Sequence, residues 1–232
     1  MYGSVDSQLT PEDLAAAARS SGLTGCCITE HNSVWERYKA VQEGERWGVP
    51  FIRGMEVSTN LGHIVVYGLG QYVSGIHDAE QLRKVVDAEA GIMIAAHPFR
   101  NLHQTTRFAR SAAEPEIPTI AEAAAYPLFG LVDDIEVFNA GTGESENLFA
   151  LAVARHLGLR GIASSDAHST HGIGRFVTVF EGEVASTGEL IAAIRSRRYY
   201  PARLEQGRAV DLNPNPASCG TSPDLAPLIA GR

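Results

Sequence analysis

The sequence predicts an α/β fold whose mainly parallel sheet closes into a barrel. Apolar segments of strand length alternate with amphipathic helical segments along most of the 232 residues, and such alternation is typical of a mainly parallel sheet. Several of the apolar segments end in a histidine or a carboxylate. Ligands on many consecutive strand ends favour a barrel, where these ends meet at one rim, over an open sheet. The length suits one domain.

The segment Gly161-Ile-Ala-Ser-Ser-Asp-Ala-His168 shows this pattern most clearly, because a short buried strand is followed by Asp166 and His168. Residues i and i+2 of a strand share a face, so the carboxylate and the imidazole point the same way. This ligand pair suits Zn, Mn or Fe. Four other strand ends carry similar residues: Thr29-Glu30-His31-Asn32, Gly54-Met55-Glu56-Val57-Ser58, Gly62-His63-Ile64 and Ala95-Ala96-His97-Pro98.

The first half of the chain opens with a loop and a helix rather than with a strand. Thr10 and Pro11 form a helix start, and Gly22 forms its end. Since a barrel of this kind normally begins with a strand, we expect that one element is missing. The elements expected next are a strand over 25–29, a helix over 34–47, and strands over 50–58 and 63–69. The gap between these last two strands is too short for a helical crossover, which predicts a hairpin or a distorted part of the sheet.

The second half continues the alternation of strands and helices. The pattern predicts helices over 78–89, 144–157 and 187–197, and strands over 92–97, 134–139, 161–165 and 176–180. Residues 101–118 form a long insertion, and loops of that length are usually functional lids or mobile. From Gly207 the chain becomes rich in Pro, Ser, Asn and Gly. We therefore expect a barrel domain over 1–206, incomplete at its N-terminus, and a flexible tail over 207–232.

Composition limits the partners and the compartment. The formal net charge of −8 argues against extended nucleic acid as a partner, although a small anion can still bind beside metals. The three cysteines include the adjacent pair Cys26 and Cys27, which strand geometry sends to opposite faces. This arrangement favours a reducing, cytoplasmic setting over a disulfide framework. No apolar run reaches the length needed to span a membrane, and the oligomeric state is open.

Taken together, the segments resemble the PHP family (polymerase and histidinol phosphatase), metal-dependent phosphoesterases on a distorted (β/α)7 barrel. The resemblance implies that TIM-like barrel, here without its first strand. The matching segments keep the family's order: Asp6-Ser-Gln-Leu-Thr-Pro-Glu-Asp-Leu14, Ile28-Thr-Glu-His-Asn32, Gly54-Met-Glu-Val-Ser58, His63, Ala96-His-Pro-Phe-Arg100, Asp134-Ile-Glu-Val-Phe-Asn139 and Ser165-Asp-Ala-His168. The family also has a His-x-His shortly before the position of Asp6. The sequence has no such pair, so we expect the chain to begin upstream of Met1.

The resemblance further implies a ligand set for about two to three divalent ions, Zn, Mn or Fe. Asp6, His31 and His168 would surround one ion. Glu56 would bridge the other two ions, with His63 and His97 on one side and Asp166 on the other. Glu30 stands where the family more often has Asp, and it either orients a ligand or simply ends the strand.

The expected reaction is the hydrolysis of a phosphate ester of a small metabolite or nucleotide, with a metal-activated water as nucleophile. Arg100 and Arg175 are candidates to clamp the phosphoryl oxygens, or else ordinary surface ion-pair partners. The buried Glu136 needs a partner, and Asn139 reads as a cap of the following loop. Two alternatives remain open: a degenerate, non-catalytic binding module, and an amidohydrolase-like C–N hydrolase.

Overall fold

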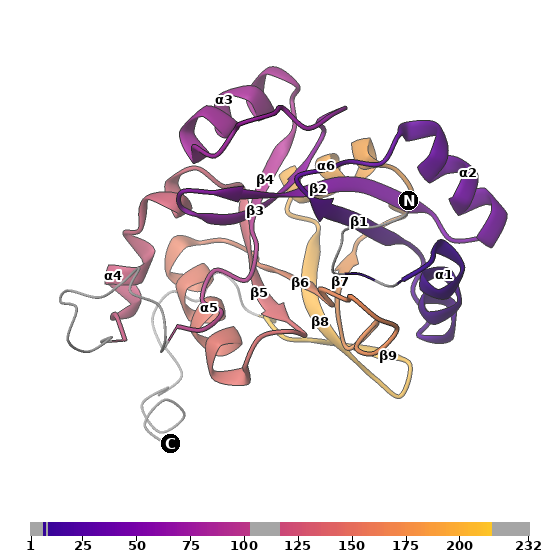
Figure 1. Cartoon of the computed structure of the whole chain (residues 1–232). Coiled ribbons are helices and arrows are strands. Elements are labelled where there is room, and N and C mark those ends of the chain that lie inside the picture. Colours follow the sequence, from indigo (N-terminus) through magenta and orange to yellow (C-terminus); the bar gives the residue numbers. More distant parts are fainter. Residues whose placement is uncertain (1–6, 8, 103–116, 215–232) are drawn as a thin grey trace.

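A computed structural model describes residue 7 and residues 9–102 and 117–214 of the chain (Figure 1). The first half contains α1 (Pro11–Ser20), β1 (Cys26–His31), α2 (Arg37–Trp47), β2 (Phe51–Thr59), β3 (Gly62–Tyr67), α3 (Ala79–Ala88) and β4 (Ile92–Ala95). The second half contains α4 (Ile120–Ala124), the 3-10 helix η2 (Pro127–Gly130), β5 (Asp134–Asn139), α5 (Glu144–Leu157), β6 (Ile162–Ser164), β7 (Phe176–Phe180), α6 (Thr187–Arg195), β8 (Tyr199–Glu205) and β9 (Arg208–Asp211).

The central feature is a curled six-stranded sheet in the order β1-β2-β3-β4-β5-β6, beside a smaller sheet in the order β7-β8-β9 (Figure 1). Strand β3 is antiparallel to both of its neighbours, whereas β1–β2, β4–β5 and β5–β6 are parallel pairs. The hairpin expected between 50–58 and 63–69 is therefore confirmed. The mixed α/β fold is as predicted, and the seven-strand barrel stays a prediction.

Alternation along the strands divides the core into two layers. Val65 and Tyr67 of β3 pack with α6 in one apolar cluster, here called the inner cluster, while Ile64 and Val66 pack on the opposite face. This is the two-residue period of a strand buried on both sides. Because Ile52 belongs to the inner cluster, Glu56, four residues later in β2, also faces inward. The inner cluster contains Ile52, Val65, Tyr67, Ile92, Ile94, Ala96, Ile162, Leu190, Ile194 and Tyr199.

Local sequence signals explain where the helices begin and end. In α1, Thr10 and Asp13 form a reciprocal capping box, and Gly22 adopts a left-handed φ of 74° just after the helix. Helix α2 begins at Arg37, three residues later than expected from Val34. The residues before it form a loop, and Arg53 donates a hydrogen bond to the carbonyl of Trp35 there.

The C-terminal part differs from the sequence prediction. Strands β8 and β9 form a hairpin, so the expected start of a flexible tail at Gly207 is wrong for residues 208–211. Beyond β9, Asn213 is buried and binds Arg155 and the carbonyl of Arg160. The smaller sheet meets the larger one through Thr178, whose hydroxyl bonds to both the amide and the carbonyl of Ala163.

Two expectations concern parts that the structure covers incompletely or not at all. Most of the predicted lid over 101–118 and the tail beyond residue 214 lie outside the described residues. In the ranges that are described, no helix combines the length and apolarity needed to cross a membrane.

Candidate metal centre

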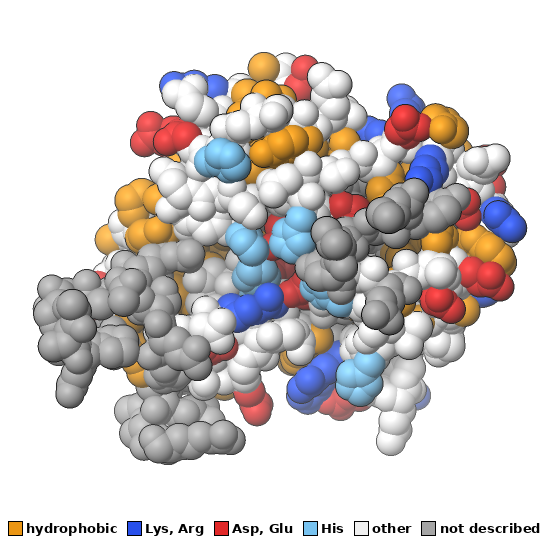
Figure 2. Space-filling model, in the orientation of Figure 1, with side chains coloured by type: hydrophobic (Ala, Val, Ile, Leu, Met, Phe, Trp, Pro, Cys, Tyr) orange, Lys and Arg blue, Asp and Glu red, His pale blue; other side chains and the backbone are white. Residues whose placement is uncertain are grey.

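The candidate ligands meet at one edge of the curled sheet. His31 ends β1, Glu56 lies near the end of β2, and His97 follows β4 by two residues. His63 comes from the beginning of β3, because this strand runs antiparallel to its neighbours. Reversal of one strand thus brings the start of β3 to the edge where the parallel strands end. Figure 2 shows histidine side chains gathered with carboxylates at the centre of this face.

The Glu56 carboxylate is the centre of the group. His63 Nδ1 lies 2.7 Å and His97 Nε2 3.1 Å from Glu56 Oε1, and His31 Nδ1 lies 3.8 Å from Glu56 Oε2. One ligand atom each of His31, Glu56 and His63 lie within 4.8 Å of one another. Three imidazole nitrogens around one carboxylate form a donor set typical of Zn, Mn or Fe sites.

The donor atoms have features that fit a metal. His63 Nδ1 is buried and forms no hydrogen bond with the described residues, since its short contact with Glu56 lacks hydrogen-bond geometry. A buried nitrogen without such a bond is costly unless something else binds its lone pair. We conclude that the residues present suit a divalent ion.

Electrostatics keep the central carboxylate ionised. Burial raises the pKa of Glu56, but the close contacts with His63 and His97 outweigh burial and hold the pKa below its usual range. Burial lowers the pKa of His97, while the hydrogen bond with Glu56 and the charge of Glu136 raise it more. A carboxylate that stays charged can bind a cation at neutral pH.

A second group lies beside the first and contains Arg100 and Asp166. Arg100 Nη2 donates to Asp166 Oδ2 and, over 2.9 Å, to Asn139 Oδ1, while its Nε donates to Thr142 Oγ1 over 3.2 Å. His97 and Asp166 both have left-handed backbones, with φ of 30° and 47°. Such conformations in residues other than glycine are strained and cluster at functional sites.

The remaining predicted residues are placed as follows. The ring of His168 turns back toward its own segment, where its Nδ1 lies 3.0 Å from the carbonyl oxygen of Asp166. Glu30 Oε1 accepts a hydrogen bond from the Trp35 indole at 3.3 Å. Arg175 lies 5.4 Å from the centroid of the Phe176 ring, which gives no link to the metal ligands, and its substrate role stays a prediction. Asp6 lies outside the described residues.

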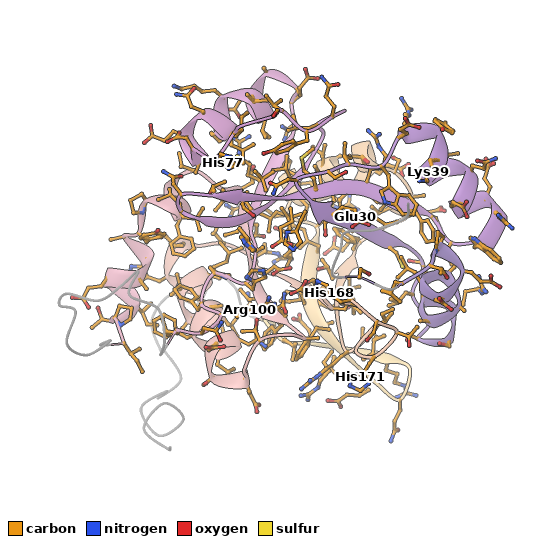
Figure 3. All side chains as sticks on the ribbon, viewed as in Figure 1. Glu30, Lys39, His77, Arg100, His168 and His171 are labelled. Atoms are coloured by element: carbon orange, nitrogen blue, oxygen red, sulfur yellow. The ribbon has the colours of Figure 1, made fainter. Side chains whose placement is uncertain are left out.

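A cavity of about 840 Å³ opens at this edge and continues inward. Its polar end is lined by Glu30, His31, Glu56, His97, Asp166 and His168. Its walls include every residue of β1 and of β7, together with apolar members of the inner cluster. In Figure 3, Arg100 and His168 lie near the centre of the face, whereas His77 lies away from them, toward α3.

Three polar residues of the site were not assigned to it from the sequence. Asn139, expected to cap a loop, binds Arg100 instead. Thr142 binds the same guanidinium, and the Ser164 hydroxyl donates to Glu136. The position of Asn139 at a strand end was a weak signal in the sequence. Thr142 and Ser164 gave none, because small polar residues after strands are common in ordinary turns.

Comparisons with known proteins find two matching family models. A family model described as PHP domain matches residues 2–132, and one described as PHP-associated matches residues 144–199. The uncharacterized protein MJ1587 of Methanocaldococcus jannaschii is 26% identical over 137 residues, which are 58% of this chain and 69% of that protein.

Two solved structures illustrate the shared fold. A two-domain protein of Bacteroides vulgatus, described as containing a predicted PHP-like metal-dependent phosphoesterase, has a TM-score of 0.59 at 19% identity, covering 84% of this chain and 60% of that chain. An amidohydrolase of Chromobacterium violaceum, with bound sulfate and no metal, has a TM-score of 0.52 at 16% identity, covering 70% and 84%. Since the PHP domain model spans more than half of the 232 residues, the chain belongs to the PHP domain family.

Proposed function

We propose that the protein hydrolyses a phosphate ester of a small metabolite or nucleotide with the help of divalent metal ions. The observation that carries the proposal is the group of three histidines around the buried, ionised Glu56, with Arg100 at its side. A net charge of −8 makes extended nucleic acid a poor substrate, so the phosphate is best presented by a small molecule.

Each residue has a defined task in this proposal. Glu56, His63 and His97 would hold one ion, while His31, His168 and Asp166 would complete the ligands that the described chain offers. Bound divalent ions supply water activation and charge neutralisation at the phosphoryl group. Arg100 offers planar N–H donors that suit bidentate contact with phosphoryl oxygens.

The first experiment measures metal content by elemental analysis of protein purified without a metal-affinity tag. We expect about two to three equivalents of Zn, Mn or Fe per chain, and phosphate release from members of a panel of phosphate esters. The variant E56Q is the matched control, because glutamine keeps the volume but removes the charge, and it should lose both metal and phosphate release. A metal-loaded parent that releases no phosphate from any ester would contradict the proposal.

The same experiment separates the two alternatives. Release of ammonia or an amine from C–N substrates, without phosphate release, would identify an amidohydrolase-like C–N hydrolase. Tight binding of small phosphorylated ligands without turnover would instead identify a non-catalytic binding module.

A further inference from the structure

We propose that Glu136 is a positioning residue that holds both His97 and Arg100 in place through hydrogen bonds. It acts through these two residues rather than on the substrate or a metal ion directly. The inference rests on the proposed function, because it assigns a role to His97 as a metal ligand and to Arg100 as a phosphate-binding residue.

Glu136 occupies a point where three strand ends meet. It lies in β5, only 6% exposed. Its Oε2 accepts hydrogen bonds from the backbone amide of His97 at 2.7 Å and from Asn139 Nδ2 at 3.0 Å, and its Oε1 accepts one from the hydroxyl of Ser164. The three donors follow β4, end β5 and end β6, respectively. One buried carboxylate thus ties together the ends of three neighbouring strands.

The first hydrogen bond of Glu136 fixes His97. The backbone of His97 is left-handed, with φ of 30°, and therefore strained. Its amide is held by Glu136 while its ring nitrogen lies 3.1 Å from Glu56 Oε1. Removing the acceptor would leave a partly buried amide without a partner and release the strained backbone, so the imidazole would move away from Glu56.

The second hydrogen bond of Glu136 fixes the side-chain amide of Asn139. Because Asn139 Nδ2 donates to Glu136, its Oδ1 faces the other way, where it accepts from Arg100 Nη2 at 2.9 Å and from the Gly141 amide at 2.8 Å. A flipped amide would point its NH₂ group at these two donors and its oxygen at a carboxylate. Glu136 therefore sets which end of Asn139 meets the guanidinium.

The geometry also predicts which substitution is tolerated. Both N–H donors approach one oxygen, Oε2, and only the hydroxyl of Ser164 approaches Oε1. A glutamine with its oxygen at the Oε2 position keeps both N–H bonds, and its NH₂ group can donate to a rotated Ser164 hydroxyl. Alanine at this position removes all three bonds.

The test compares E136A, E136Q and N139A with the parent chain in three measurements. Metal affinity is measured with Mn²⁺ alone against a chelating indicator, phosphate affinity with inorganic phosphate on the Mn²⁺-loaded protein, and thermal stability by circular dichroism. We expect E136A to weaken Mn²⁺ binding by about 10- to 100-fold, the usual cost of losing a group that orients a ligand, and E136Q to restore most of this loss. N139A should weaken phosphate binding by a larger factor than Mn²⁺ binding.

Two results would overturn the inference. If E136A lowers only the melting temperature, Glu136 is merely structural. If E136Q is as impaired as E136A, the charge rather than the hydrogen bonds matters. Should E136A fail to fold, N139A still tests the contact of Asn139 with Arg100, and E136Q tests the role of charge. Failure of the proposed function would show differently, as a metal-loaded parent chain that releases no phosphate from any ester.

Discussion

At the scale of single residues, a buried pair away from the metal centre joins the two sheets. Tyr199 in β8 donates its hydroxyl to Asp134 Oδ2 in β5, and both side chains are at most 2% exposed. The other oxygen of Asp134 accepts from the amides of Ile135 and Gly161. Burial raises the pKa of Asp134 to about 6, although these hydrogen bonds lower it.

This raised pKa gives stability a defined pH dependence. The folded state holds the Asp134 proton more tightly than the unfolded chain. The contribution of this proton to the free energy of unfolding is therefore complete below about pH 4 and is lost as the pH rises through about 6. We expect the variant D134N to gain stability relative to the parent between these pH values, by up to about 3 kcal/mol. Urea unfolding in the presence of EDTA at several pH values measures the difference.

The matched control is E89Q, which removes an exposed carboxylate at the end of α3. Its stability difference from the parent should vary far less over this pH range. A D134N difference as flat as that of E89Q would show that Asp134 titrates normally in the folded state.

At the scale of elements, a glycine determines how closely β2 and β3 pack. Gly54 has no side chain, and a Cβ built there would lie 2.7 Å from the Tyr67 ring and 3.0 Å from the carbonyl oxygen of Val66. The Tyr67 ring is buried in the inner cluster. The ring therefore occupies the space that a side chain at Gly54 would need.

We expect G54A to destabilise the fold by roughly 1–3 kcal/mol, because extra volume in a packed core forces neighbours out of their preferred rotamers. Chemical denaturation of G54A and G70A measures this effect. Gly70 is a suitable control, since a Cβ there meets no atom within 4 Å. Equal stabilities of the two variants would show that Tyr67 moves aside at no cost.

The elements that could be predicted from the sequence are those defined by nearby residues. The capping box of Thr10 and Asp13 spans four residues, and the hairpin of β2 and β3 follows from a gap too short for a helix. Strand β9 was missed because all four of its residues are exposed and lack apolar alternation. It forms only because the edge of β8 is available for pairing, which is a tertiary effect.

The same distinction applies to the candidate site. The histidines and Glu56 could be proposed because each ends or begins an apolar strand. The contact of Arg100 with Asp166, by contrast, joins residues 66 positions apart, and the three bonds to Glu136 converge from different strand ends. No local pattern encodes such convergence, which depends on the curl of the whole sheet.

At the scale of the whole molecule, bound metal should stabilise the fold. The candidate ligands come from β1, β2, β3 and the end of β4, so an ion there would link four strands. A ligand that binds only the folded state raises stability by about 2.7 kcal/mol at a concentration 100 times its Kd. We expect Mn²⁺ or Zn²⁺ to raise the melting temperature of EDTA-treated protein, and E56Q to lose most of this rise. A parent melting temperature that neither ion changes would argue against the site.

The reversed direction of β3 has a consequence for insertions and deletions in this protein. Glu56 and His63 stand on either side of a two-residue turn, Asn60 and Leu61, in a register that pairs Thr59 with Gly62. One extra residue in this turn can be absorbed only as a bulge or as a one-place slip of β3, and a slip would turn His63 to the opposite face of the sheet. We expect a single alanine inserted between Asn60 and Leu61 to weaken Mn²⁺ binding, whereas the same insertion beside the exposed Gly70 should not. The length of this two-residue turn therefore determines whether His63 faces the metal centre.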